Sequence, residues 1–299
     1  MAEIAPQKKV NVQKQPDEEV LSPWREAWKG FRRNKLAMVG MGIVLFFILL
    51  AIFAGVIAPE GINEQKLGER LQSPSASHWF GTDDFGRDIL SRIIYGARIS
   101  LWVGFFAVLG SAAVGSLLGM VAGYYGKLVD TIISRIFDIM LAFPSILLAI
   151  AVVAVLGPSL RNALIAIAII NIPNFGRLVR SRVLSVKQEE YVMAARAVGM
   201  RDSRIIFHHV LPNSLAPIIV QGTLAIATAI LEAAALSFLG LGAQAPQPEW
   251  GKMLADSRSY IIQAPWTVFF PGLAIMLTVL GFNLLGDGLR DALDPKMKK

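Results

Sequence analysis

Apolar residues are concentrated in six long runs separated by polar segments, and this pattern predicts a chain that crosses a membrane six times. Each run approaches the length of about 20 residues that a helix needs to cross a hydrocarbon core of about 30 Å. The expected spans are residues 36–58, 99–121, 136–156, 163–178, 215–239 and 268–285. The predicted fold class is therefore all-α, a polytopic membrane protein with six transmembrane helices.

The composition supports a membrane protein over a soluble enzyme. Hydrophobic residues make up 54% of the 299 residues and charged residues only 17%, against about 45–50% and about 25% in soluble domains. A soluble protein could not cover so much apolar surface. The chain has no cysteine, which excludes disulfides, cysteine-ligated zinc, iron–sulfur clusters and thiol nucleophiles.

The distribution of Lys and Arg predicts the orientation. Six spans place both termini on one side, and 21 of the 29 Lys and Arg residues lie on that side. Because cytoplasmic loops carry the excess of these residues, both termini are expected in the cytoplasm of a cell-membrane protein. The net charge of +7 then reports topology. A nucleic-acid-binding face would need basic residues interleaved with aromatic ones, and no such pattern is visible.

The chain divides into five expected segments. They are a cytoplasmic tail with an interfacial helix (1–35), the first span (36–58), an extracytoplasmic loop (59–98), a core of five spans with a cytoplasmic loop at 183–213 (99–288), and a cytoplasmic tail (289–299). The interfacial helix is expected from Ser22 onward, because Trp24, Trp28 and Phe31 form an apolar stripe. The alternative is a solvated linker.

The extracytoplasmic loop contains acidic residues flanked by glycines in the segment 78–88. This pattern predicts a tight turn followed by a helix from Ile89. A metal site at His78 with nearby Asp residues is a weaker interpretation, because one histidine without helical pair spacing is poor evidence for a metal.

Two features predict how the spans pack. Gly115, Gly119 and Gly123 form a doubled G-x-x-x-G in the second span, and small residues at this spacing allow a close helix–helix approach. Arg135 and Asp138 lie three residues apart and can pair on one helix face. The alternative is that both side chains snorkel to the cytoplasmic interface.

The loop between the fourth and fifth spans predicts two short helices. Residues 188–198 favour a helix, and Gly199 fits the position after its C-terminus. A second helix is expected to follow and to be closed by Leu211 and Pro212. Small alanines on the face of this two-helix segment suggest a surface for a docking partner. The alternative is an amphipathic segment that lies on lipid.

No catalytic residue set is present. The sequence lacks a phosphate-binding loop, a G-x-S-x-G, an H-E-x-x-H and paired intramembrane carboxylates. Glu232 is the ionisable residue well inside a span, and such residues are functional candidates. With Asn171, Gln221 and Asn283 it is expected to line a water-filled pathway and to attract a cation such as a peptide amino terminus. The alternative is helix packing or an ion pair with a partner subunit.

The cytoplasmic loop resembles the signature E-A-A-x₃-G-x₉-I-x-L-P of inner-membrane permeases of binding-protein-dependent ABC importers. Here Met193 stands for the Glu and His209 for the Ile, whereas the other positions agree: Ala194, Ala195, Gly199, Leu211 and Pro212. Within these importers the chain is similar to the C-type permeases of the peptide/nickel branch. That similarity covers residues 22–296 and is carried by residues 80–83, 86–88, 91–92, 96–101, 237–244, 248–251 and 283–295.

The resemblance implies a type I ABC importer permease fold and a non-catalytic subunit. The implied partners are a second permease, two cytoplasmic ATPases that bind ATP and Mg²⁺, and an extracytoplasmic binding protein that delivers di- or oligopeptides. The seven signature positions would contact an ATPase. The residues expected to meet the binding protein are Asp83, Arg87, Asp88, Glu249 and Trp250. Import of glutathione or nickel is an alternative, and a self-sufficient secondary carrier is a further one.

Overall fold

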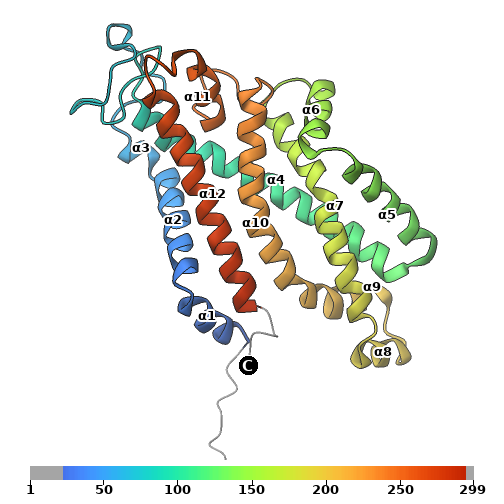
Figure 1. Cartoon of the computed structure of the whole chain (residues 1–299). Helices are drawn as coiled ribbons and strands as arrows, with labels where there is room; N and C mark the ends of the chain where they lie inside the picture. Colours follow the sequence, from blue (N-terminus) through green and yellow to red (C-terminus); the bar gives the residue numbers. More distant parts are fainter. Residues whose placement is uncertain (1–22, 294–299) are drawn as a thin grey trace, which may run out of the picture.

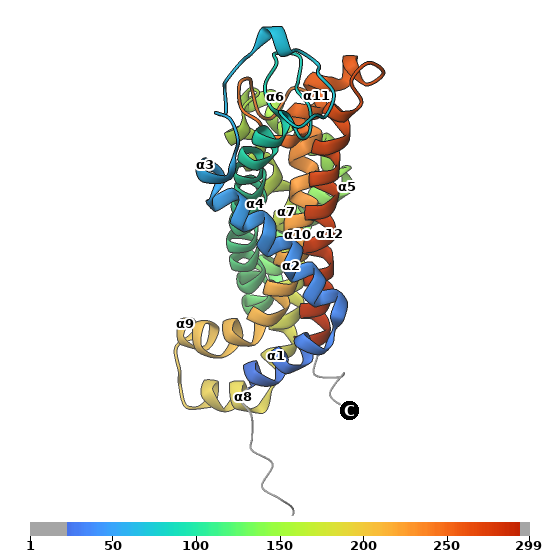
Figure 2. The same ribbon diagram turned by 90° about the vertical axis from the view of Figure 1, so that its left-hand side faces the viewer.

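The structure is a computed structural model that describes residues 23–293. The expectations for residues 1–22, including the start of the interfacial helix at Ser22, and for residues 294–299 lie outside this range. Long helices run beside one another, with short helices and loops at both ends (Figure 1). A view turned by 90° shows α8 and α9 at one end of the bundle and α11 at the other (Figure 2).

The described chain is helical almost throughout. Its elements are α1 (Pro23–Arg33), α2 (Lys35–Ile52), α3 (Ala54–Ile57), the 3₁₀ turn η1 (Leu67–Glu69), α4 (Ile89–Tyr125), α5 (Lys127–Ala142), α6 (Ser145–Leu156), α7 (Leu160–Val186), α8 (Glu190–Ala197), α9 (Asp202–Ile205), the π-helical turn η2 (Ile206–Val210), α10 (Leu211–Phe238), α11 (Trp250–Ser257), the 3₁₀ turn η3 (Arg258–Tyr260) and α12 (Trp266–Leu293).

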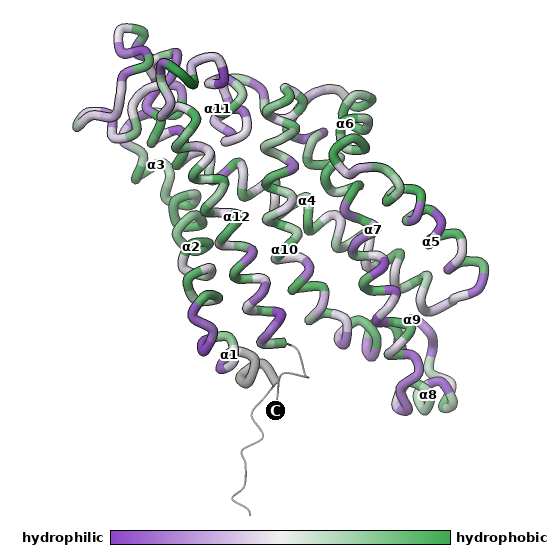
Figure 3. The backbone as a smooth tube through the Cα atoms, viewed as in Figure 1, coloured by the Kyte–Doolittle hydropathy of each residue, from purple (hydrophilic) through white to green (hydrophobic). Residues whose placement is uncertain are grey.

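The described helices agree with the predicted number of spans. Five are each long and apolar enough to cross a membrane, namely α2, α4, α7, the run from α9 through α10, and α12, and the number is six when the bent pair α5 and α6 is counted as one span. Hydrophobic residues occupy the middle of the long helices, whereas hydrophilic residues gather towards α1 and α8 and in the loops near α11 (Figure 3). The last helix extends to Leu293, so it includes the beginning of the expected tail.

The third expected span is broken, and the prediction of one continuous helix over 136–156 is wrong. The two helices α5 and α6 meet at an angle of 97°. The break lies at Phe143 and Pro144, both of which have extended ψ angles near 130–140°. Because a residue before proline is disfavoured in the helical region, the apolar run bends at this dipeptide although its hydrophobicity continues.

The doubled glycine motif packs α4 against α7, as the sequence predicted. A Cβ atom on Gly115 would lie 2.5 Å from the carbonyl oxygen of Ile172, and one on Gly119 would lie 2.3 Å from the carbonyl oxygen of Gly176. A Cβ on Gly123 would lie 2.8 Å from Val183. The backbones of the two helices therefore touch along three successive turns.

Glycines also allow a close contact between the first span, α2, and the last, α12. A Cβ on Gly40 of α2 would lie 2.7 Å from the backbone nitrogen of Leu285, and one on Gly288 of α12 would lie 2.1 Å from Cβ of Ala37. The helix α1 follows the expected position of the interfacial helix, and within it Trp28 stacks on the buried Phe31 at 5.8 Å.

Gly119→Ala is expected to destabilise the chain by about 1–3 kcal/mol, because the added methyl group must displace backbone atoms of α7. Gly110→Ala is the matched control on the same helix, since its Cβ would meet only Ala168 at 3.6 Å. Thermal unfolding of the purified chains in detergent measures the difference. Equal midpoints for the two variants would contradict the assignment of α4–α7 contact to Gly119.

Candidate functional site

A cavity of about 240 Å³ opens between α10, α7 and the elbow where α5 meets α6. One stripe of α10 forms its longest wall, with residues at intervals of three and four: Gln221, Leu224, Ala225, Thr228 and Glu232. This spacing places the five side chains on one helix face. The stripe spans about 16 Å at 1.5 Å per residue, so the cavity is elongated along the bundle.

The other walls come from α7 and from the elbow. On α7 the lining residues are Ile170, Asn171 and Asn174, and at the elbow they are Met140, Leu141, Phe143, Ser145 and Leu148. The lining includes residues on both sides of the 97° bend at Pro144, namely Leu141 and Phe143 before it and Ser145 and Leu148 after it. The cavity therefore depends on the break that the hydrophobic pattern did not reveal.

Glu232 and Asn171 meet in this cavity. The Nδ2 atom of Asn171 donates to Oε2 of Glu232 at 3.1 Å and to the backbone oxygen of Ile167 at 3.0 Å. Asn174 donates to Oδ1 of Asn171 at 3.4 Å. Among the described residues, Oε1 of Glu232 has no hydrogen-bond partner. The carboxylate is thus held on one side and remains available to a bound group on the other.

Of the four residues expected along a pathway, three line the cavity and one does not. Glu232, Gln221 and Asn171 share it, whereas Asn283 lies exposed on α12 and outside its lining. The place of Asn283 along a pathway therefore stays a prediction. Thr228 and Asn174 also line the cavity, and neither was predicted from the sequence. The helical spacing from Gln221 to Glu232 was the signal that could have found Thr228.

The segment of residues 188–212 projects beyond the long helices at the α8 end (Figure 1). Gly199 has a φ angle of +80°, and the amide of Met200 donates to the carbonyl of Ala195 at 3.1 Å across it. This is the Schellman arrangement that favours glycine after a helix. The predicted helix over 188–198 and its glycine terminus are confirmed.

The second predicted helix does not end at Leu211 and Pro212. Helical backbone continues from α9 through the π-helical turn η2 into α10, and Pro212 lies in the first turn of α10. Proline lacks an amide hydrogen and crowds the preceding turn, and a π-helical turn is a common local adjustment inside a helix. The prediction that this dipeptide closes a short helix is therefore wrong.

The signature positions lie on the outside of this segment. Met193 is 53% exposed. Ala194, Gly199 and Pro212 are also exposed, whereas Ala195, His209 and Leu211 are half-buried. The exposed apolar side chains Val198 and Phe207 lie in the same segment. This end of the chain therefore presents a surface of small and apolar residues.

Hydrogen bonds tie the segment to the long helices. The hydroxyl of Tyr124, in the last turn of α4, donates to Asp202 of α9 at 2.5 Å, and the Arg196 guanidinium lies over the same ring at 5.3 Å. Asn213 of α10 donates to the hydroxyl of Tyr191 on α8 at 3.1 Å. Nearby, Asp138 pairs with Arg177 of α7 and not with Arg135, which corrects the expected pair.

The five residues expected to meet a binding protein are buried at the α11 end. Their exposed fractions are 7% or less: Asp83, Arg87, Asp88, Glu249 and Trp250. Arg87 donates to Asp83 at 2.6 Å, and Trp250 donates to the backbone oxygen of Ile93 at 3.1 Å. The expectation that these side chains offer a contact surface is corrected, because they are used inside the loops.

Two of these residues cap helices. Glu249 accepts from the amides of Gly251 and Lys252 at the start of α11, and burial raises the pKa of its carboxyl group although these bonds oppose the shift. Asp88 accepts from the amide of Ser91 at 2.7 Å at the start of α4. The turn and cap interpretation of segment 78–88 is confirmed.

Two family models match the chain. Residues 115–299 match the binding-protein-dependent transport system inner membrane component, and residues 22–74 match the N-terminal TM domain of oligopeptide transport permease C. Among solved structures, the chain is similar to an inward-facing conformation of the MetNI methionine ABC transporter, with a TM-score of 0.55 and 17% identity over 68% of this chain and 97% of that one. This likeness shows the fold.

Curated relatives are similar over nearly their whole length. The dipeptide transport system permease protein DppC of Alkalihalophilus pseudofirmus is 70% identical over 93% of this chain and 91% of the relative. The glutathione transport system permease protein GsiD of Pectobacterium atrosepticum is 50% identical over 94% of each chain. The GsiD protein of Shigella sonnei is 52% identical over 95% of this chain and 93% of the relative.

Tyr124→Phe is expected to raise hydrogen exchange in residues 200–205 by about tenfold, since a hydrogen bond to a charged group contributes about 1.5–3 kcal/mol. Tyr125→Phe is the matched control, because the neighbouring ring is 54% exposed. Mass spectrometry of the exchanged full chain measures the effect. The same increase in both variants would contradict a specific tie between α4 and α9.

Proposed function

Since this chain belongs to the family of binding-protein-dependent transport system inner membrane components, in the branch of the peptide permeases, we propose that it is one permease subunit of an ATP-driven dipeptide importer. The observation that carries the proposal is the elongated cavity along α10, which has a carboxylate at one end. The 70% identity to a dipeptide permease supports the substrate class.

One chain supplies one side of the pathway in this proposal. The cavity is bounded by α10, α7 and the α5–α6 elbow, and a second permease completes the enclosure. Glu232 attracts the protonated amino terminus of the peptide, because Asn171 fixes the carboxylate while leaving Oε1 available. Gln221 and Thr228 supply neutral polar groups farther along the same wall. A substrate that leaves Glu232 therefore still finds hydrogen-bonding partners in the cavity.

Partner ATPases drive the subunit through residues 188–212. The exposed positions Met193, Ala194 and Gly199 fit a groove on an ATPase in the cytoplasm, which binds ATP and Mg²⁺. Because α9, η2 and α10 form one helical run, a displacement of the projecting segment moves the wall that carries Glu232. An extracytoplasmic binding protein delivers the peptide at the opposite end.

Glutathione is the second candidate substrate. Permeases named for glutathione transport are 50–52% identical to this chain, and glutathione also has an amino group that Glu232 could accept. Measuring the affinity of the associated binding protein for a dipeptide and for glutathione distinguishes these two candidate substrates.

The proposed function is tested with proteoliposomes that contain the chain together with its partner permease and ATPases. Binding protein loaded with dipeptide is expected to stimulate ATP hydrolysis and dipeptide uptake, whereas the chain alone hydrolyses no ATP. Uptake by the chain alone, driven by an ion gradient, would overturn the proposal in favour of a secondary carrier.

Gly199→Val is expected to reduce uptake at least about tenfold while the chain still inserts. A β-branched residue cannot readily adopt the positive φ angle, and no atom lies within 4 Å of an added Cβ, so the change acts through the backbone. Gly199→Asn is the matched control, because asparagine tolerates this conformation. The ratio of uptake to ATP hydrolysis measures coupling, and equal ratios in both variants would count against the role of this bend.

Glu232→Gln is expected to lower dipeptide uptake by about tenfold, because the isosteric amide keeps the bond to Asn171 in reach but loses the charge. Asn283→Ala is the control on α12, outside the cavity. ATP hydrolysis stimulated by the binding protein is measured in parallel to verify assembly. Normal uptake by Glu232→Gln with normal hydrolysis would indicate that Glu232 serves helix packing.

A further inference from the structure

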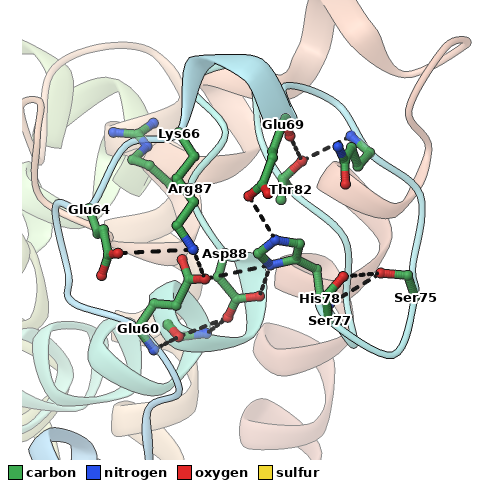
Figure 4. Close-up of polar contacts among 12 residues, drawn as sticks. Glu60, Glu64, Lys66, Glu69, Ser75, Ser77, His78, Thr82, Arg87 and Asp88 are labelled. Carbon is green, nitrogen blue, oxygen red and sulfur yellow. Dashed lines mark hydrogen bonds and ion pairs between the residues drawn. The ribbon is translucent and has the colours of Figure 1, made fainter.

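His78 occupies the centre of a polar cluster at the α11 end, in the loop that leads to α4 (Figure 4). The side chain is buried, with 3% of the residue exposed. Its Nδ1 atom lies 3.2 Å from Oδ1 of Asp88, and its Nε2 atom lies 3.2 Å from Oε2 of Glu69. Both ring nitrogens therefore face carboxylates.

This geometry favours the protonated ring. A neutral imidazole has one N–H donor and one lone pair, whereas the imidazolium ion has two donors. With a neutral ring, one nitrogen lone pair would point at a carboxylate oxygen. Only the protonated ring donates to Asp88 and Glu69 at once.

The remaining charged groups around the ring add to this preference. Oε1 of Glu60 lies 3.9 Å from Nδ1 of His78. Oε2 of Glu60 is buried without a hydrogen-bond partner among the described residues. The nearby cation Lys66 is already paired with Glu60 at 2.5 Å. Three carboxylates thus face the ring from three segments, namely the loop after α3, η1 and the start of α4.

The cluster joins these segments through His78. Asp88 uses its other oxygen to cap α4, accepting from the amide and the hydroxyl of Ser91 at 2.7 and 2.8 Å. The amide of Glu60 donates to the same hydroxyl at 2.9 Å. We propose that protonated His78 acts as a latch, because it holds the loop 59–88 against the start of α4 through its contacts with Asp88 and Glu69. Deprotonation of the ring breaks the contact with Glu69 and frees that part of the loop.

The direction of the pH dependence follows from the surroundings of the ring. Burial acts against the charged form, but the hydrogen bonds to Asp88 and Glu69 and the charge of Glu60 outweigh it, so the pKa of His78 is raised above its usual 6.5. A raised pKa in the folded state adds stability that is fully present below the unfolded value. This stability is lost as the pH rises through the folded value, so the latch is closed in mildly acidic medium and opens in alkaline medium.

The test is hydrogen exchange of residues 60–88 in the full chain, in lipid nanodiscs, between about pH 5.5 and 9, corrected for intrinsic exchange rates. Wild type is expected to lose protection at least about fivefold across this range. Glu69→Gln removes one carboxylate and is expected to reduce the change strongly, and His78→Asn is expected to abolish it.

Glu64→Gln is the matched control, because Glu64 is an exposed carboxylate of the same loop that pairs only loosely with Lys66, at 3.9 Å. It should retain the wild-type pH dependence. Two results would overturn the latch: protection in wild type that does not change with pH, or an undiminished change in Glu69→Gln. If His78→Asn does not fold, the result for Glu69→Gln decides between the two interpretations.

Discussion

The backbone contact between α4 and α7 is the constraint on which the rest of this architecture depends. Three glycines of α4 let its backbone touch that of α7, and no larger residue fits at this distance. Gly176, on the α7 side of the contact, also receives the ring of Phe137 from α5, where a Cβ would lie 2.3 Å from that ring. The glycine contact therefore sets where α7 and α5 stand, and with them two of the three walls of the cavity.

The sequence predicted the elements whose signals are local. The doubled glycine spacing and the position of Gly199 each depend on one helix or one turn, and both are confirmed. Two breaks were mispredicted for opposite reasons. Apolar residues continue on both sides of Pro144, so the hydrophobic pattern did not reveal the 97° bend. At Pro212 a proline suggested an end, but a π-helical turn allows the helix to continue.

The candidate site was partly predictable, because an intramembrane polar residue needs a partner or water. That reasoning brought together Glu232, Asn171 and Gln221, which line one cavity. Asn283 lies on the exposed side of α12 outside this cavity, a position that depends on packing. The charged residues at the α11 end were assigned to a surface because polar loop residues are usually solvated. Asp83, Arg87 and Glu249 instead satisfy one another and the helix ends inside the loops, a choice that only the three-dimensional structure decides.

The length of α4 has a mechanical consequence. Its 37 residues span about 55 Å at 1.5 Å per residue, considerably more than a hydrocarbon core of about 30 Å. One end is capped by Asp88 inside the histidine cluster, and the other end holds Asp202 through Tyr124. The backbone contact of α4 with α7 at Gly115, Gly119 and Gly123 lies between these two attachments, close to the Tyr124 end. Because this contact lies next to Tyr124 and about 26 residues from Ile89, a tilt of α4 about it displaces the Asp88 end much farther than the Tyr124 end.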